Sequence, residues 1–133
     1  MAPARFSAAR IGADAEGRVS EALAARGWLI LGRNVRFGRT ELDVVAVDPG
    51  PPPWLVIVEV RWRRSRSHGY PEETVDHGKR ARLREGAGRL AGADALPDGT
   101  PLPRLPVRVD VVAVEPGPAG RPIMRHHRHA LGG

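Results

Sequence analysis

The chain has 133 residues with 21 basic against 15 acidic side chains, a formal net charge of +6, and no cysteine. This length suits one domain with a modest core, and the composition excludes disulfides, thiolate zinc sites and an apolar segment of the ~20 residues that span a bilayer. We therefore expect a cytoplasmic protein with no membrane contact.

The first half of the chain predicts a helix followed by strands. Residues 13–26 place apolar side chains at helical spacing, and Gly27 is a natural stop. Residues 28–37 predict a strand that is interrupted near Gly32. The β-branched and apolar runs at 41–48 and 54–63 flank the segment PGPPP, which cannot extend either strand. We expect these two runs to form a hairpin.

The second half predicts one more helix and one or two strands. Pro71 suits the first turn of a helix that would end near Gly92, with four residues on a shared stripe: Lys79, Leu83, Ala87 and Leu90. Residues 106–116 predict a strand in which Asp110 pairs with Arg108 or another arginine, and PIMRHHRHAL adds either an edge strand or a tail.

This order of elements predicts an α/β fold with a central mixed sheet of about four to five strands, flanked by helices. We expect a single domain over residues 1–120, followed at 121–133 by a basic C-terminal tail or edge strand. HHRH at 126–129 contains side chains that bind metals, but we interpret it as a basic terminus.

The hairpin carries acids where core residues are expected. Side chains alternate along a strand, so Glu41, Asp43 and Val45 should share one face. A symmetric hairpin about Pro51 pairs residues whose numbers sum to 102, which sets Asp43 opposite Glu59 and Glu41 opposite Arg61. Opposed carboxylates repel by up to roughly 1 kcal/mol at an exposed site. Either a divalent cation or a structural network of ion pairs with arginines would offset that repulsion.

Several short motifs occur in the same order along the chain as in a known protein family. The residues are E at 16, G27, RN at 33–34, ELD at 41–43, EVR at 59–61, K79 and VRVDVV at 107–112. They resemble the YraN-like family of uncharacterised bacterial proteins, which is similar to restriction-endonuclease-like nucleases of the PD-(D/E)XK type, including Holliday-junction resolvases. The resemblance implies a restriction-endonuclease-like fold over roughly residues 10–115.

The resemblance also implies a metal-dependent centre. Asp43 and Glu59 would hold Mg²⁺ or Mn²⁺ together with Glu16 and the backbone carbonyl of Val60. The family's lysine is replaced by Arg61, which stays protonated and cannot act as a base. Lys79, the only lysine, matches another family lysine and is the alternative source of catalytic charge, or else a phosphate contact. Glu41 would position Arg61 or another basic side chain.

Basic side chains concentrate in the middle of the chain. Residues 61–90 contain nine Arg or Lys and four acids, whereas residues 1–60 contain seven Arg and seven acids. Such a block predicts contact with nucleic-acid phosphates, although a solvated arginine-rich surface is the alternative. The candidate phosphate contacts are Arg36, Arg63, Arg64, Arg66, Arg80, Arg82 and Arg84.

Three functions follow from these patterns. The first is a metal-dependent nuclease that hydrolyses phosphodiesters, with DNA as the expected polymer and, by analogy with resolvases, a homodimer. The second is a catalytically inactive nucleic-acid-binding module on the same fold, which predicts salt-sensitive binding without cleavage. The third is an interaction protein whose hairpin acids form ion pairs.

Overall fold

The computed structural model describes residues 8–63 and 75–131, with side chains described from residue 14 onward. Its elements in chain order are α1 (Ala8–Ala25), β1 (Leu29–Phe37), β2 (Thr40–Asp48), β3 (Trp54–Trp62), α2 (His77–Ala91), β4 (Val107–Pro116), the 3-10 turn η2 (Pro118–Gly120) and β5 (Pro122–His127). Neither helix of the described residues has the length and apolarity needed to cross a membrane.

The strands form one mixed sheet in the order β1-β2-β3-β4-β5. β1, β2 and β3 are antiparallel neighbours, β3 and β4 are parallel, and β5 returns antiparallel to β4. Because β3 and β4 are parallel, the chain must cross over between them, and α2 lies in that connection. The expected α/β fold with a mixed sheet is confirmed, while the likeness to restriction endonucleases stays an inference from the sequence motifs.

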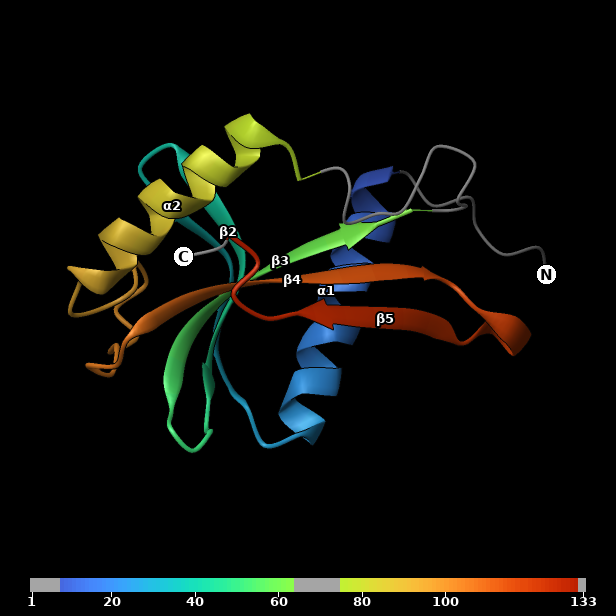
Figure 1. The fold of residues 1–133 in the computed structure, drawn as a ribbon, viewed down its shortest axis with the longest axis horizontal. Helices are drawn as coiled ribbons and strands as arrows, with labels where there is room; N and C mark the ends of the chain where they lie inside the picture. The colour runs from blue at the N-terminus through green and yellow to red at the C-terminus, as the bar shows by residue number, and fades with distance from the viewer. Residues whose placement is uncertain (1–7, 64–74, 132–133) are drawn as a thin grey trace.

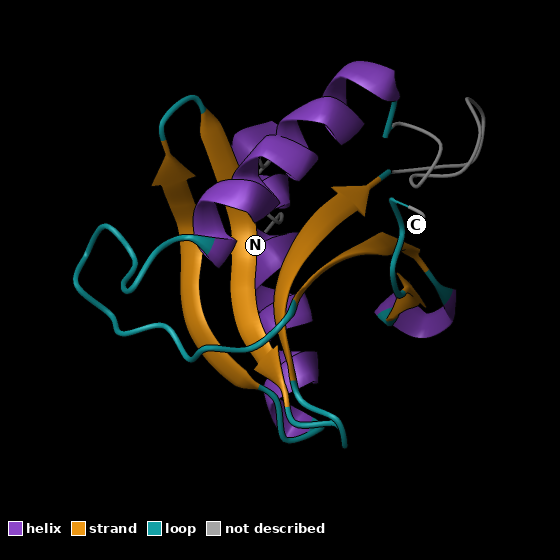
Figure 2. Cartoon of the chain, turned by 60° about the vertical axis from the view of Figure 1, so that its left-hand side comes forward, coloured by secondary structure: helices purple, strands orange, loops and turns teal. Residues whose placement is uncertain are grey.

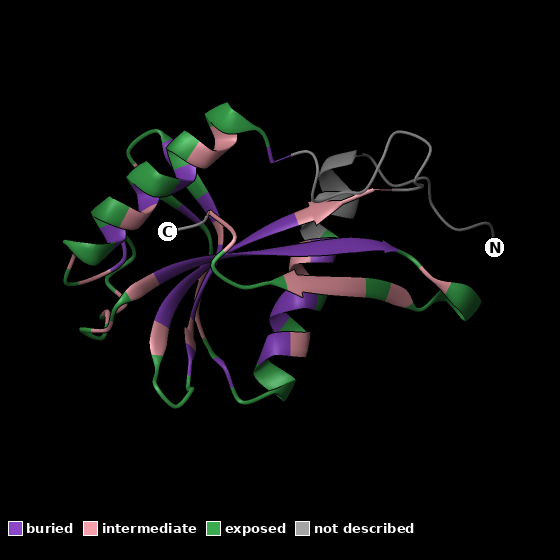
Figure 3. Cartoon of the chain, in the orientation of Figure 1, coloured by how far each residue is buried: buried purple, intermediate pink, exposed green. Residues whose placement is uncertain are grey.

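One helix covers each face of the sheet (Figures 1 and 2). On the face of α1, a core cluster combines Ala15, Val19 and Leu23 with alternate residues of β2, β3 and β4. On the face of α2, a second cluster combines Leu83 and Leu90 with the intervening strand residues. Figure 3 shows β4 buried along nearly its whole length, as expected for a strand with neighbours on both sides and a helix on both faces.

Local signals in the sequence set most element boundaries. Gly27 follows α1 with a φ of 89°, the left-handed conformation in which glycine commonly ends a helix. The register of β1 against β2 shifts between Ile30 and Gly32, where the interruption was expected. The second helix, however, begins at His77 instead of Pro71, because Asp76 is its extended N-cap and accepts a 2.9 Å hydrogen bond from Lys79 N–H. Pro71 lies outside the described residues.

Candidate functional site

The candidate site lies where β2 and β3 separate. Their ladder has the expected register and ends at the pair Val44 and Val58. Beyond this pair, Asp43 Oδ2 accepts a 2.8 Å hydrogen bond from the N–H of Val60. The N–H and C=O of one strand residue point toward the same side, so the Val60 carbonyl also faces β2. A side chain thus replaces strand pairing here, and the structure brings Asp43 and Val60 together.

Strict alternation along β2 fails at Asp43. The sequence placed Asp43 and Val45 on one face and Leu42 on the other, but Leu42 and Val45 pack in the same core cluster against α2. Asn34 lies opposite Asp43 across the β1–β2 ladder and has a φ of 50°, which is unusual for a residue with a side chain. The irregular step directs Asp43 toward Val60 and away from regular strand packing.

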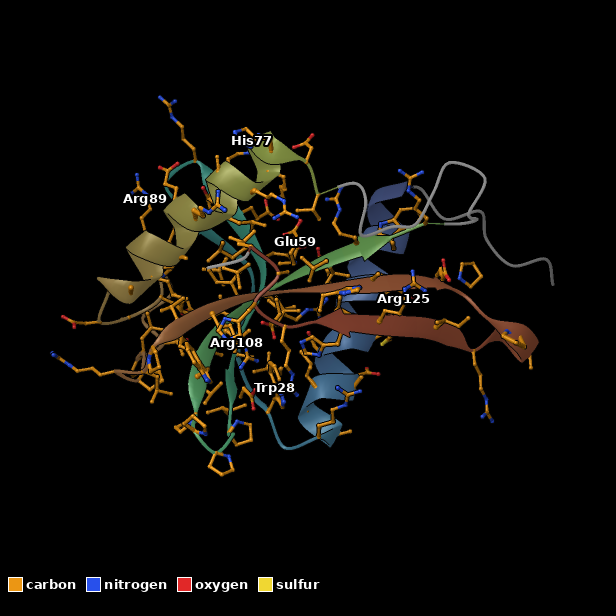
Figure 4. The ribbon with its side chains drawn as sticks, viewed as in Figure 1. Trp28, Glu59, His77, Arg89, Arg108 and Arg125 are labelled. Atoms are coloured by element: carbon orange, nitrogen blue, oxygen red, sulfur yellow. The ribbon has the colours of Figure 1, made fainter. Side chains whose placement is uncertain are left out.

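Glu59 is the buried member of the site. Its side chain is only 1% exposed on the α2 face of β3 (Figure 4). Glu59 Oε1 lies 3.2 Å from Lys79 Nζ and 3.4 Å from a guanidinium nitrogen of Arg61. Glu59 Oε2 is buried and has no hydrogen-bond partner among the described residues. A buried carboxylate oxygen without a partner destabilises the fold, and a ligand bound there would remove that cost.

Two carboxyl groups beside Asp43 bind their protons more tightly than usual. Burial, reinforced by the negative charge of Asp43, raises the pKa of Glu59 from 4.5 to about 7, even though Lys79 opposes this rise. Burial and the same Asp43 charge also raise the pKa of Glu16 from 4.5 to about 7. The structure therefore gathers Glu16, Asp43 and Glu59 from α1, β2 and β3 into one acidic centre.

The carboxylates suit a divalent cation in chemistry but do not converge on one point. Among the residues that the structure describes, no group of three or more acidic, histidine or cysteine side chains is arranged to hold an ion. Mg²⁺ needs only one or two carboxylates, because waters and substrate phosphate complete its shell. The unpartnered Oε2 of Glu59 and the repulsion from Asp43 both favour such an ion. These residues therefore fit a cation held by Asp43 and Glu59, with Glu16 beside them.

Arg33 is a residue of this centre whose role the sequence did not predict. Its guanidinium lies against the backbone of α1, within 3.6–3.9 Å of the position that a Cβ on Gly17 would take. Its positive charge counteracts the rise in the pKa of Glu16. The sequence contained Arg33 only as part of the RN motif. Its proximity to α1 arises from the packing of β1 against that helix, which no local pattern reveals.

Lys79 reaches Glu59 because α2 packs closely on the sheet. Lys79 lies in the first turn of α2, and Leu83 and Leu90 on the same stripe are fully buried. At Gly86 a Cβ would lie only 2.9 Å from Leu42 Cδ2 and 3.2 Å from Thr40 Cγ2. Glycine therefore permits the close approach of helix and strand. The expectation that Lys79 faces the sheet is confirmed.

The predicted basic contacts are divided among different places. Glu41 pairs with Arg36 at 3.3 Å, which is the expected alternative of another basic side chain, and the β2–β3 ladder ends before the expected pair of Glu41 and Arg61. Arg80 and Arg84 donate to backbone carbonyls near the C-terminus. The remaining predicted contacts are Arg82, which is exposed on α2, Arg63, which is half-buried after β3, and Arg64 and Arg66, which lie outside the described residues.

A second charged cluster is structural. Arg108 is buried on the α1 face and donates to Asp110 at 2.8 and 2.9 Å and to Asp48 at 2.9 Å. Burial alone would raise the pKa of Asp110, but hydrogen bonds from His126 and Arg108 outweigh burial and hold it below its usual value. The expected pairing of Asp110 with Arg108 is confirmed. Figure 4 shows Arg108 apart from Glu59.

Comparison with known proteins identifies relatives over most of the chain. Residues 15–114 match the model of the uncharacterised protein family UPF0102. A UPF0102 protein of Symbiobacterium thermophilum is 45% identical over 112 residues, covering 84% of this chain and 87% of the relative. A UPF0102 protein of Roseiflexus castenholzii is 37% identical over 118 residues, covering 89% of each. One of an Arthrobacter strain is 41% identical over 120 residues, covering 86% of this chain and 94% of the relative.

Proposed function

Since the chain belongs to the UPF0102 family, the YraN-like family to which its motifs point, we propose that it binds nucleic acid and hydrolyses phosphodiester bonds with Mg²⁺ or Mn²⁺. The observation that carries this proposal is Glu59. Its carboxyl group is buried, has one unpartnered oxygen and lies beside both Asp43 and the cation of Lys79. In the buried Arg108 cluster both neighbouring acids accept hydrogen bonds from the arginine, whereas one oxygen of Glu59 accepts none from the described residues.

The acidic centre supplies what such hydrolysis needs. A divalent cation bound there would activate water and neutralise charge on the phosphate. Asp43 would hold it from the end of the β2–β3 ladder, where the N–H of Val60 fixes the carboxylate, and the Val60 carbonyl faces the same side. Glu59 would hold it from β3 through the oxygen that has no hydrogen-bond partner. Glu16 would lie beside the bound water as its proton acceptor, and a cation on Asp43 would offset part of the rise in the Glu16 pKa that the Asp43 charge causes.

Two cations stand beside Glu59 and would stabilise charge that develops on the phosphate. Lys79 Nζ is closer to Glu59 Oε1, at 3.2 Å, than the guanidinium of Arg61, at 3.4 Å. A compact ammonium on a flexible stem adjusts to a changing phosphate more readily than a planar guanidinium does. We propose that Lys79 supplies the charge that the family's motif lysine would provide, and that Arg61 positions Glu59.

The alternative is an inactive nucleic-acid-binding module. The observation in its favour is Arg61, because both it and Lys79 are already paired with Glu59. In this alternative the two cations neutralise Glu59 permanently, and exposed side chains such as Arg82 contact phosphates. It predicts binding that weakens steeply with salt and does not depend on a divalent cation.

The test is a cleavage assay with four-way-junction, duplex and single-stranded DNA, in Mg²⁺, Mn²⁺ or EDTA. The variants are Asp43→Asn, Glu59→Gln and Lys79→Met, and Glu41→Gln is a matched control because Glu41 lies on the same strand but pairs with Arg36. We expect cleavage that requires the cation, disappears in Asp43→Asn and persists in Glu41→Gln. Salt-sensitive binding without cleavage in any cation would favour the inactive module.

A further inference from the structure

β1 and β2 each contain one residue more than regular alternation allows, at the same level of their ladder. On β1, Gly32 and Val35 share the α2 face, since a Cβ on Gly32 would lie 2.9 Å from Val35 Cγ2 and 3.0 Å from Leu96 Cδ1. Their partners on β2, Val45 and Leu42, share the same face. Regular alternation puts one residue between two that share a face, yet each strand has two. A residue pair is therefore inserted into the ladder.

The inserted pair is Asn34 and Asp43. Arg33 pairs with Val44, whose side chain lies in the core cluster on the α1 face, so these two residues occupy the position that regular alternation supplies. Asn34 and Asp43 are the residues that remain, and neither belongs to a core cluster. The register is the same on both sides of the pair. Both strands thus make the irregular step together, whereas an ordinary bulge adds a residue to one strand alone.

Asn34 provides the backbone conformation for this step. Its φ of 50° lies in the left-handed region, which residues with a Cβ generally avoid and which asparagine adopts more readily than most. Among the described residues, Ala119 and His129 also combine a side chain with a positive φ, but only Asn34 lies within a strand. A strained conformation directly opposite an acid of the centre points to a role in placing that acid.

The inserted pair decides what Asp43 can reach. In a regular strand Asp43 would share the α2 face with Val45, with the sheet between it and α1. At the step it lies between the two faces, where its Oδ2 accepts the hydrogen bond from the N–H of Val60. The charge of Asp43 acts on Glu59 on the α2 face and on Glu16 of α1, and it raises the pKa of both. One carboxylate thus joins an acid from each face.

We propose that Asn34 is a positioning residue of the acidic centre: its left-handed backbone inserts the pair that places Asp43 between the two faces, where Asp43 holds the cation together with Glu59. The inference rests on the proposed function for its cation. It gives the asparagine of the RN motif a role that acts through the backbone. Glycine should therefore replace Asn34, because glycine adopts a positive φ as readily as a negative one, whereas a β-branched residue should not.

The test separates the backbone of Asn34 from its side chain. Asn34→Gly removes the carboxamide and leaves the left-handed conformation accessible. Asn34→Val opposes that conformation most strongly, and Asn34→Ala opposes it more mildly and decides the question if Asn34→Val does not fold. Ala119→Val is the matched control, because Ala119 has a φ of 55° in the exposed turn between β4 and β5. It introduces the same kind of strain on strands that carry no residue of the cation site.

Two measurements on the full chain, without DNA, would follow the position of Asp43. Isothermal titration calorimetry would provide the affinity for Mn²⁺, and amide hydrogen exchange followed by NMR would report on the N–H of Val60, which Asp43 accepts. We expect Asn34→Val and Asn34→Ala to bind Mn²⁺ roughly 10- to 100-fold more weakly than the wild type and to exchange the Val60 proton faster. Asn34→Gly should bind Mn²⁺ within about threefold of the wild type.

Thermal unfolding of each variant separates positioning from a merely structural role. Ala119→Val should unfold at a lower temperature than the wild type and bind Mn²⁺ with unchanged affinity, because its strain does not reach Asp43. A merely structural role for Asn34 would give the same result in Asn34→Ala. A positioning role predicts that Asn34→Ala loses affinity for Mn²⁺ as well and that Asn34→Gly restores it.

Each outcome decides the inference. Weak Mn²⁺ binding in Asn34→Ala with rescue in Asn34→Gly supports it. Equal losses in these two variants, unchanged affinity in Asn34→Ala, or no Mn²⁺ binding by the wild type would overturn it. If the expected pattern appears but the wild type cleaves no DNA in Mg²⁺ or Mn²⁺, the hydrolysis proposal fails and the role of Asn34 stands. If the wild type cleaves DNA and every Asn34 variant binds Mn²⁺ normally, the reverse holds.

Discussion

Replacing Glu59 with glutamine distinguishes an acidic centre built for a cation from a structural ion pair. The folded pKa of Glu59, about 7, is higher than its ordinary value of 4.5. Between pH 4.5 and pH 7 the folded protein therefore binds more protons than the unfolded chain does. The contribution of protonated Glu59 to the free energy of unfolding is fully present below about pH 4.5 and is lost as the pH rises through 7. Glutamine has the same shape and stays neutral, so the variant should lack this dependence.

The magnitude follows from the size of the shift. A rise from 4.5 to about 7 corresponds to roughly 3 kcal/mol at high pH, of which about 2 kcal/mol falls between pH 5 and pH 8. Asp48 and Asp110, whose pKa values are lowered, stay ionised over this range. Glu16, whose pKa is also raised to about 7, and the histidines are common to both proteins. The difference in the free energy of unfolding between the wild type and Glu59→Gln therefore reports the contribution of Glu59 to the pH dependence of stability.

Urea unfolding in EDTA, followed by tryptophan fluorescence, would provide the free energy of unfolding at each pH. We expect Glu59→Gln to be more stable than the wild type by about 3 kcal/mol at pH 8 and by about 1 kcal/mol at pH 5. Millimolar Mg²⁺ should stabilise the wild type at pH 8 and leave the variant unchanged. A wild type that gains stability relative to Glu59→Gln as the pH rises would refute the reasoning, since Lys79 and Arg61 would then hold Glu59 ionised.

Three further substitutions test the packing and the charges. Gly86→Ala places a methyl group 2.9 Å from Leu42 Cδ2 and should lower the free energy of unfolding by about 1–2 kcal/mol. Gly88→Ala places its methyl group where nothing lies within 4 Å, and it should raise the free energy of unfolding by roughly 0.5–1 kcal/mol. Urea titrations of both variants would measure these changes. Arg108→Met leaves two buried carboxylates without their partner and should destabilise the fold by about 3–5 kcal/mol in the same assay; a loss below about 1 kcal/mol would contradict a structural role. Lys79→Met should slow DNA cleavage by roughly 100-fold in single-turnover assays. An unchanged rate would mean that another side chain supplies the positive charge that stabilises the phosphate.

The sequence by itself determined the elements and the pairing of the hairpin. Apolar residues at helical spacing and Gly27 defined α1, and the PGPPP segment fixed the register in which Val44 pairs with Val58. These features depend on residues close together in the chain, so local rules of spacing and turn chemistry suffice to predict them. The stripe that contains Lys79 and Leu83 was predictable for the same reason.

Only the tertiary structure decided how the acidic centre is assembled. The irregular step at Asp43, the proximity of Arg33 to α1 and the pairing of Glu41 with Arg36 depend on where strands separate and how helices pack. Such contacts join residues far apart in the sequence, and their energies depend on burial and neighbouring charge, which no local pattern encodes.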